Sequence, residues 1–227
     1  MDDKGRPNIL FVLTDQQSVH AMSCAGNPHL DTPHMDALAA SGTRFESAYC
    51  AAPVCGPSRG SLMTGRLPHE TGVLVNGMTP DPSIPTLGEL FSRTGYRTGW
   101  SGRWHLPGNK DIHGFETLHD PHVRLGLGLE GDSRVTDAAV DFLRQKHQRP
   151  FCLGVSLCNP HDICHWIMDQ STPADRKIRF PFASAPDAAD LPPLPPNFAV
   201  DPQEPEFIST CRQRTYYGQE GTFTQEW

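Results

Sequence analysis

Two short, uninterrupted apolar runs constrain the fold more than any other feature of the sequence. They are Asn8–Leu13 and Phe151–Leu157, and both have the length of a β-strand. An apolar run without polar alternation is typical of a strand that helices cover on both faces. Helix signals separate the two runs, and this order favours parallel βαβ units. We therefore expect an α/β fold with a mostly parallel central sheet.

Four segments carry the start and stop signals of helices. A threonine–proline pair opens the first, and a glycine ends each of the first three. The expected helices are residues 32–41 with Thr32 as N-cap, residues 58–64, residues 85–95, and a helix capped by Asp132 or Ser133. Residues 96–100 are expected to form a further strand.

The charge and hydropathy of the chain argue against two classes of partner. Lys and Arg number 19 against 26 Asp and Glu, which gives a formal net charge of −7. Nucleic acid and anionic lipid are bound by clustered basic residues, which this balance does not favour. No apolar run approaches the ~20 residues that a membrane helix needs. We expect neither a nucleic-acid nor a membrane partner.

The length of the chain fits one domain of ordinary core size. Its 227 residues include eight prolines between Pro181 and Pro205, where hydrophobic periodicity is weak. Proline lacks a backbone donor, so this stretch predicts a long extended excursion within the domain rather than packed helix or sheet.

The cysteine count predicts the redox environment. Seven cysteines cannot all pair within one chain, and no signal-peptide pattern opens the sequence. These two observations favour reduced thiols and a cytoplasmic location, with a periplasmic or secreted location if a leader is missing. At least one thiol is left for another role.

The segment 51–66, Ala-Ala-Pro-Val-Cys-Gly-Pro-Ser-Arg-Gly-Ser-Leu-Met-Thr-Gly-Arg, carries the most chemical information. Cys55 lies just before an expected helix N-terminus, where unpaired N–H groups and the helix dipole favour an anion. Arg59 follows four residues later, close enough after one turn to face it. A lone cysteine at such a place is more often an ordinary buried residue, so the wider pattern must decide.

Other polar residues follow the expected strands. Asp15 and Gln16 come after the first strand, and ligands of open parallel sheets bind beyond the carboxyl ends of the strands. Arg103 and His105 occupy alternate positions, so both point to one side if the chain is extended there. His161, in Asn159-Pro-His161, follows the strand at 151–157.

These segments together resemble the formylglycine-dependent sulfatases. The resemblance spans roughly residues 6–165, and the matching stretches occur in the family's order. They are residues 6–16, 32–39, 55–66 and 95–106. The resemblance implies an alkaline phosphatase-like fold with three αβα layers, of which this chain would hold an incomplete N-terminal catalytic domain. It also implies hydrolysis of a small-molecule or carbohydrate sulfate ester.

The resemblance assigns the chemistry to Cys55. A formylglycine-generating enzyme would oxidise it to an aldehyde, which hydrates to a diol. One hydroxyl then attacks sulfur and the alcohol leaves, and the other hydroxyl expels sulfate and restores the aldehyde, which is covalent catalysis. A divalent cation, Ca²⁺ or Mg²⁺, would be held by Asp15, Gln16 and the group derived from Cys55.

The remaining site residues implied by the resemblance are Arg59, Arg103, His105 and His161. Arg103 stands where the family usually has lysine; it neutralises a sulfate oxygen but cannot donate a proton near neutral pH. His105 is then the better candidate for steadying the diol or protonating the leaving group. The family's Asn-Pro-His motif gives His161 contact with sulfate or the role of acid.

Three alternatives stay open at this point. Asn76 lies 21 residues after Cys55, where an asparagine lines the site of related phosphonate monoesterases, which permits a phosphonate or phosphate diester hydrolase. A zinc cluster of Cys158, His161, Cys164 and His165 has suitable spacing, but adjacent ligands strain tetrahedral geometry. The chain also lacks the Asp-His-Gly or Asp-Asn segment that completes the family's metal site, so a non-catalytic fragment is the third reading.

Overall fold

The computed structural model describes residues 5–107, 113–119 and 128–162, with short stretches between 189 and 208. The chain divides into two compact units, Met1–His161 and Asp162–Trp227. All helices and strands named below belong to the first unit. Most of the proline-rich stretch 181–205 lies outside the described residues.

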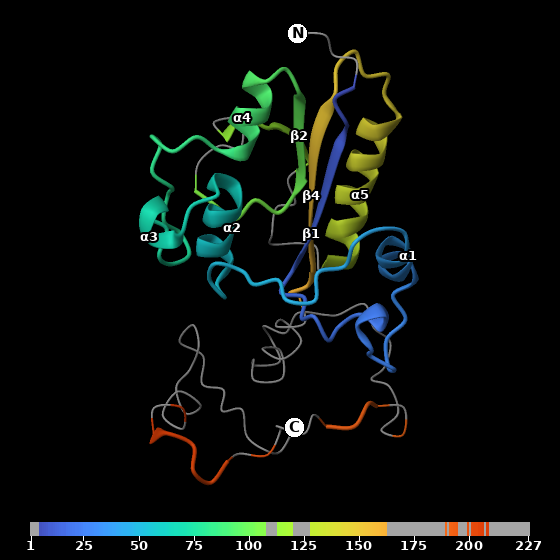
Figure 1. The fold of residues 1–227 in the computed structure, drawn as a ribbon, viewed down its shortest axis with the longest axis vertical. Helices are drawn as coiled ribbons and strands as arrows, with labels where there is room; N and C mark the ends of the chain where they lie inside the picture. The colour runs from blue at the N-terminus through green and yellow to red at the C-terminus, as the bar shows by residue number, and fades with distance from the viewer. Residues whose placement is uncertain are drawn as a thin grey trace, which may run out of the picture. The chain divides into compact units, whose positions relative to one another are not determined.

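A parallel sheet forms the centre of the first unit (Figure 1). Within the described residues its strands are β1 (Ile9–Asp15), β2 (Arg97–Gly102), β3 (Glu116–His119) and β4 (Phe151–Pro160). They are arranged in the order β1-β4-β2-β3, and every pair is parallel. The predicted parallel sheet is confirmed, and its first and last apolar runs are neighbours.

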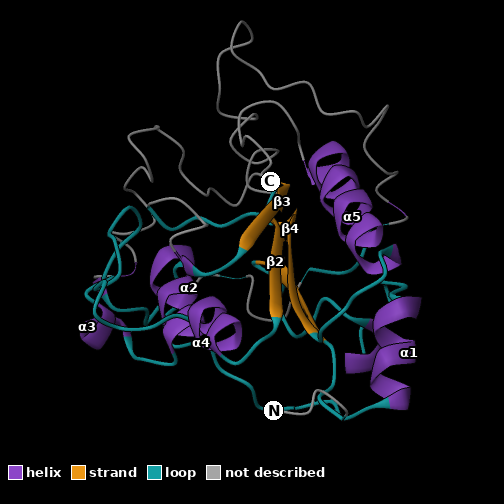
Figure 2. Cartoon of the chain, turned by 90° about the horizontal axis from the view of Figure 1, so that it is seen from above, coloured by secondary structure: helices purple, strands orange, loops and turns teal. Residues whose placement is uncertain are grey.

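Helices cover the sheet on two sides (Figure 2). On one side lie α2 (Cys55–Thr64), α3 (Pro68–Thr71) and α4 (Leu87–Arg93), and on the other lie α1 (Pro33–Ser41) and α5 (Gly128–Arg144). A short 3₁₀ turn, η1 (Ser23–Ala25), precedes α1. The expected three αβα layers are therefore confirmed.

The described core has one apolar cluster on each side of the sheet. The cluster toward α2 and α4 consists of Met63, Val73, Trp100, Trp104, Leu106 and Phe115. The cluster toward α5 consists of Val135, Ala139, Phe142, Phe151, Leu153 and Val155. Gly154 of β4 lets the Trp100 indole approach the strand closely, because a Cβ there would collide with the ring.

The two apolar runs differ in how well they are covered. Every residue of β4 from Phe151 to Ser156 is buried. In β1, Leu10 is 51% and Val12 56% exposed. Leu10 and Val12 are two positions apart and so lie on the same face of β1, an edge strand among the described residues. The expectation of cover on both faces is therefore right for the second run and wrong for the first.

Helix boundaries show where local signals suffice. Thr86 caps α4 in a capping box with Glu89, so the helix expected over residues 85–95 spans Leu87–Arg93. Thr32 precedes α1, but its side chain makes no cap bond to the helix and instead contacts Ser23 and Asp36. The helix expected to be capped by Asp132 or Ser133 begins earlier, at Gly128, so Asp132 lies inside α5.

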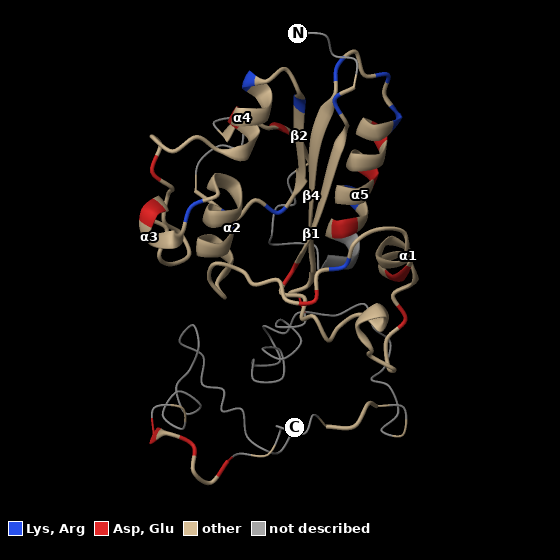
Figure 3. Ribbon diagram, viewed as in Figure 1, with Lys and Arg blue, Asp and Glu red and all other residues tan. Residues whose placement is uncertain are grey.

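Charged residues of both signs are dispersed over the first unit rather than gathered in one patch. Figure 3 shows acidic residues on α1, α3 and α5 and basic residues on α4 and β2. No helix among the described residues combines the length and the apolar character needed to cross a membrane.

Candidate active site

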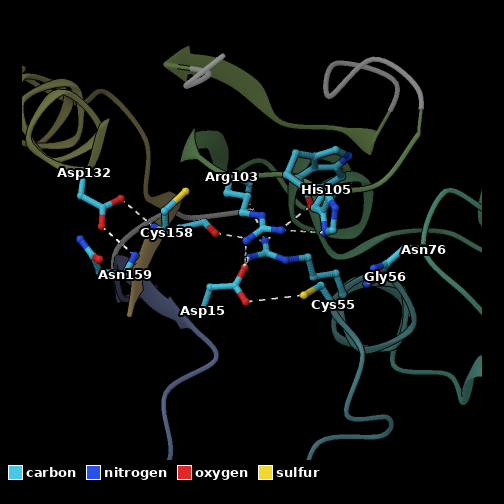
Figure 4. A network of polar contacts seen from close by, with 12 residues as sticks. Asp15, Cys55, Gly56, Asn76, Arg103, His105, Asp132, Cys158 and Asn159 are labelled. Carbon is cyan, nitrogen blue, oxygen red and sulfur yellow. Dashed lines mark hydrogen bonds and ion pairs between the residues drawn. The ribbon is translucent and has the colours of Figure 1, made fainter. Parts of the chain in front are cut away.

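Residues from four elements meet where the parallel strands end (Figure 4). Asp15 is the last residue of β1, Arg103 follows the last residue of β2, and Asn159 lies at the end of β4. Cys55 is the first residue of α2. The carboxyl edge of a parallel sheet is where polar groups were expected to converge, and the structure brings them together there.

A buried carboxylate between two guanidinium groups forms the base of the site. Asp15 Oδ2 accepts from Arg103 Nη1 at 2.7 Å and from Arg59 Nη2 at 3.1 Å. All three residues are at most 7% exposed. Burial of charges is tolerated only when they are paired, so the geometry of this triad is strongly constrained. Two cations against one anion leave a net positive charge, which suits an anionic ligand.

Ser156 of β4 links the two arginine-bearing segments. Its hydroxyl accepts from Arg59 Nη1 at 3.1 Å, and its carbonyl oxygen accepts from the Arg103 backbone N–H at 2.9 Å. Arg59 Nη1 also donates to the Arg103 carbonyl oxygen at 2.7 Å. Ser156 was not among the residues predicted from the sequence, where its only signal was a single hydroxyl within an apolar strand.

Burial lowers the pKa of the Arg59 guanidinium, and the Asp15 charge opposes this shift. An arginine retains its proton under such conditions. The position therefore carries a fixed positive charge beneath Cys55.

Cys55 faces Asp15 at the N-terminus of α2. Its thiol donates a long hydrogen bond to Asp15 Oδ1, with Sγ and Oδ1 3.7 Å apart. Partial burial and the Asp15 charge raise the pKa of the thiol, against the opposing influence of Arg103 and Arg59. The side chain is a protonated thiol at neutral pH and not a ready thiolate, although two arginines lie close by.

The start of α2 depends on a residue from outside the helix. Asn76 Oδ1 accepts from the Gly56 N–H at 2.7 Å, and thereby satisfies one of the unpaired donors at the helix start. A Cβ at Gly56 would lie 2.8 Å from this oxygen, so glycine is required for the approach. Asn76 thus lies beside Gly56, the residue after Cys55, and its carbonyl oxygen is already bound.

His105 contacts Arg103, but the backbone there is not extended, so the alternate spacing is not the reason for the contact. His105 has a φ of 57°, and its Nδ1 lies 3.3 Å from Arg103 Nη2. Arginine can only donate, so Nδ1 is the acceptor and the ring proton is assigned to Nε2. Partial burial and the charges of Arg103 and Arg59 lower the pKa of His105 to about 4. The ring is therefore neutral at pH 7.

His161 follows β4 at the same edge. Its backbone N–H donates to the Cys158 carbonyl oxygen at 3.0 Å, and its charge adds to those that lower the pKa of His105. The backbone N–H groups of Cys158 and Asn159 donate to the Asp132 carboxylate. Asp132 was predicted to cap a helix, so its link to this edge of the sheet was not predicted from the sequence.

The described residues do not fit a metal ion by themselves. No group of three or more His, Cys, Asp or Glu among them is placed to hold one. Asp15 is paired with two cations, and Gln16 is exposed with a φ of 63°. Calcium takes six to eight oxygen ligands, which this set does not approach. The zinc alternative needs Cys164 and His165, which lie outside the described residues.

Comparison with known proteins gives a consistent result. A family model described as Sulfatase matches residues 7–220. The chain is 34% identical over 193 residues to an uncharacterised sulfatase of Escherichia coli, covering 69% of this chain and 39% of that protein. It is 32% identical over 180 residues to an N-acetylglucosamine-6-O-sulfatase of Bacteroides thetaiotaomicron, covering 70% of this chain and 32% of that protein.

A solved structure agrees with these relatives. A Bacteroides thetaiotaomicron protein assigned to the sulfatases superposes with a TM-score of 0.70 at 29% identity. The match covers 86% of this chain and 42% of the other chain. The chain spans less than half of the length of the three proteins compared.

Proposed function

The chain belongs to the sulfatase family, and from this we propose that it hydrolyses a sulfate monoester at the site around Cys55. One observation carries the proposal: Cys55 opens α2 with its sulfur turned to a buried Asp15–Arg59–Arg103 triad. A nucleophile position thereby lies above a net positive charge. That combination suits attack on the sulfur of a negatively charged ester.

The arginines have different parts in binding the ester. Arg59 donates hydrogen bonds to Asp15, Ser156 and the Arg103 carbonyl oxygen. Its contribution to binding the ester is therefore its positive charge. Arg103 Nε has no hydrogen-bond partner among the described residues. Since an unpaired buried donor is costly, an anion that accepts from the Arg103 guanidinium gains more than it would from a saturated one.

The state of Cys55 supports modification rather than direct attack by the thiol. A raised pKa keeps the thiol protonated, and a protonated thiol is a weak nucleophile. We therefore propose that a formylglycine-generating enzyme converts Cys55 to formylglycine. When present, this group supplies a hydrated aldehyde as nucleophile, and Asp15 Oδ1 lies where it would accept a proton from that group.

Proton transfer to the leaving alcohol falls to His161. Arg103 cannot act as an acid, and His105 is neutral at pH 7 with its proton on Nε2. His105 is suited to donate a hydrogen bond from Nε2 to an oxygen of the reacting group. General acid catalysis by His161 is worth roughly 10²–10⁴-fold for an ester with a poor leaving group.

We propose that calcium binding needs oxygen ligands beyond the described residues. Asp15 is the single buried carboxylate beside Cys55 in this part of the chain, and two guanidinium groups already neutralise it. Titration calorimetry of this chain with calcium tests the proposal. We expect no saturable binding below the millimolar range, and tight binding that Asp15→Asn abolishes would contradict it.

The relatives suggest the class of substrate. One of them is named for removal of a 6-O-sulfate from N-acetylglucosamine, a sulfated carbohydrate. We propose a carbohydrate or other small-molecule sulfate ester for this chain. The phosphonate hydrolase alternative gains nothing from Asn76, whose carbonyl oxygen is bound to the start of α2.

The test begins with the state of residue 55. The chain is co-expressed with a formylglycine-generating enzyme, and the peptide containing Cys55 is weighed by mass spectrometry. Formylglycine lowers its mass by about 18 Da, because oxygen replaces sulfur and two hydrogens are lost. Hydrolysis of an aryl sulfate and of a phosphonate monoester is then compared.

We expect preference for the sulfate, no turnover by Cys55→Ala, and full turnover by the matched control Cys50→Ala, which changes an exposed cysteine. Preference for the phosphonate would favour the alternative enzyme. An unmodified, inactive chain would favour the hypothesis of a non-catalytic fragment.

A further inference from the structure

Asp132 joins helix α5 to the end of strand β4. Its two carboxylate oxygens accept from the backbone N–H of Cys158 at 2.6 Å and of Asn159 at 2.9 Å (Figure 4). Both bonds are charge-assisted, and such bonds are roughly twice as strong as neutral ones. A residue that the sequence presented as a helix cap therefore holds a strand end.

The strand needs this support because its ladder is interrupted there. The pairing of β1 with β4 runs from Ile9↔Cys152 to Leu13↔Ser156 and resumes at Asp15↔Pro160. On the other side, the pairing of β2 with β4 ends at Gly102↔Ser156. Three residues of β4 thus oppose one of β1, which is a bulge. Buried backbone donors that leave a ladder require other acceptors, and the Asp132 carboxylate supplies two.

The supported bulge leads directly to His161. The His161 N–H donates to the carbonyl oxygen of Cys158, the residue whose own N–H is bound to Asp132. The Cys158 peptide units are therefore fixed at both ends, by α5 on one side and by the His161 turn on the other. Backbone rotation at this point would move the imidazole away from the edge where Arg103 and His105 lie.

We propose that Asp132 is a positioning residue that holds His161 in the orientation needed to protonate the leaving alcohol. The inference rests on the proposed function for the role of His161. Asp132 acts through the backbone of Cys158 and Asn159 and makes no contact with the reacting atoms. Its effect on turnover should accordingly depend on the leaving group.

The variant Asp132→Asn tests this with little change of shape. An amide has one acceptor oxygen, so its NH₂ group would face one of the two backbone donors. Asp137→Asn is the matched control, because Asp137 is an exposed carboxylate on the same helix. Both variants remove one negative charge from α5. Only Asp132→Asn also removes a hydrogen-bond acceptor from the backbone N–H groups of β4.

The first measurement is amide hydrogen exchange of the whole chain, which does not depend on activity. We expect exchange at Cys158, Asn159 and His161 to accelerate at least about tenfold in Asp132→Asn and to stay unchanged in Asp137→Asn. Unchanged exchange at these three amides in Asp132→Asn would overturn the proposal. Inactivity of the unchanged chain would contradict the proposed function. Amide exchange would still show whether Asp132 holds the backbone that leads to His161.

The second measurement compares two esters of different leaving groups. For an alkyl sulfate, which needs an acid, we expect Asp132→Asn to lower kcat by about tenfold or more, with KM little changed. For an activated aryl sulfate the loss should be less than about twofold. In a His161→Ala background, Asp132→Asn should lower kcat no further. Equal losses for both esters, or additive losses in the double variant, would show a merely structural role.

Discussion

Two parts of the site differ in how firmly the protein holds them. Asp15, Arg59, Arg103 and Ser156, here called the charged frame, are buried and joined by short hydrogen bonds. Cys55 and His105, here called the reactive rim, are partly buried or exposed and touch the frame through contacts of 3.7 and 3.3 Å. The frame therefore carries stability and charge, whereas the rim can be chemically altered at small cost to the fold.

The largest expected effect separates the rim from the frame. Cys55→Ala should lower turnover by at least about 10⁴-fold, because it removes the precursor of the proposed nucleophile. The free energy of unfolding should change by less than about 1 kcal/mol, because the thiol makes only a long hydrogen bond. Steady-state kinetics and urea unfolding measure the two effects. A large loss of stability would place Cys55 in the frame.

Asp15→Ala should have the opposite pattern. It leaves two buried guanidinium groups without their carboxylate, and breaking a buried ion pair in this way costs about 3–5 kcal/mol. Urea unfolding should show this loss before any assay is attempted. The double replacement of Asp15 and Arg59 by alanine should cost less than the sum of the single losses, since each removes the other's partner. Full additivity would mean that the two charges do not interact.

Arg59→Lys tests whether the frame needs geometry as well as charge. Lysine keeps the positive charge but cannot bridge Asp15, Ser156 and the Arg103 carbonyl in one plane. We expect a loss of about 1.5–3 kcal/mol in the free energy of unfolding. Arg66→Lys, at an exposed position after α2, is the control and should be neutral. Equal behaviour of the two variants would argue against a rigid frame.

The smallest effect concerns the pH dependence contributed by His105. Its folded pKa of about 4 lies below the ordinary histidine pKa of 6.5, so the unfolded chain binds more protons between these values. This residue therefore favours the folded state less as pH falls from about 6.5 toward 4. Urea unfolding at pH 5 and pH 7 should show a smaller pH effect in His105→Gln than in the unchanged chain. An identical pH effect would contradict the lowered pKa.

Much of the fold could be predicted because its signals are local. Thr86 and Glu89 form a capping box within four residues, and Gly65 ends α2 in the left-handed conformation that favours glycine. The start of α2 was placed three residues late. Its Gly56 N–H obtains an acceptor from Asn76, which lies 20 residues further along, and such a tertiary cap leaves no local signal.

Part of the candidate site could be predicted because the carboxyl ends of parallel strands lie at the same edge of the sheet. That geometry brought Asp15 and Arg103 together, and the family resemblance added Cys55 and Arg59. Ser156 and Asp132 were missed for different reasons. Ser156 looked like an ordinary small residue in a strand, and Asp132 had the residue type of a helix cap. Their roles depend on a bulge and on strand order, which periodicity does not reveal.

The packing of Trp100 has an optical consequence. Its ring meets that of Trp104 edge to face, with centroids 5.0 Å apart, and Arg103 lies between them in the chain. Two rigid indoles at this distance give a distinct near-ultraviolet circular dichroism signal, which is lost when fixed packing is lost. Because Arg103 is bonded to Trp104 in the chain, we expect an anion that binds the Arg103 guanidinium to change this signal. Near-ultraviolet circular dichroism during titration with sulfate would therefore test the proposed anion site without a label and before any turnover is observed.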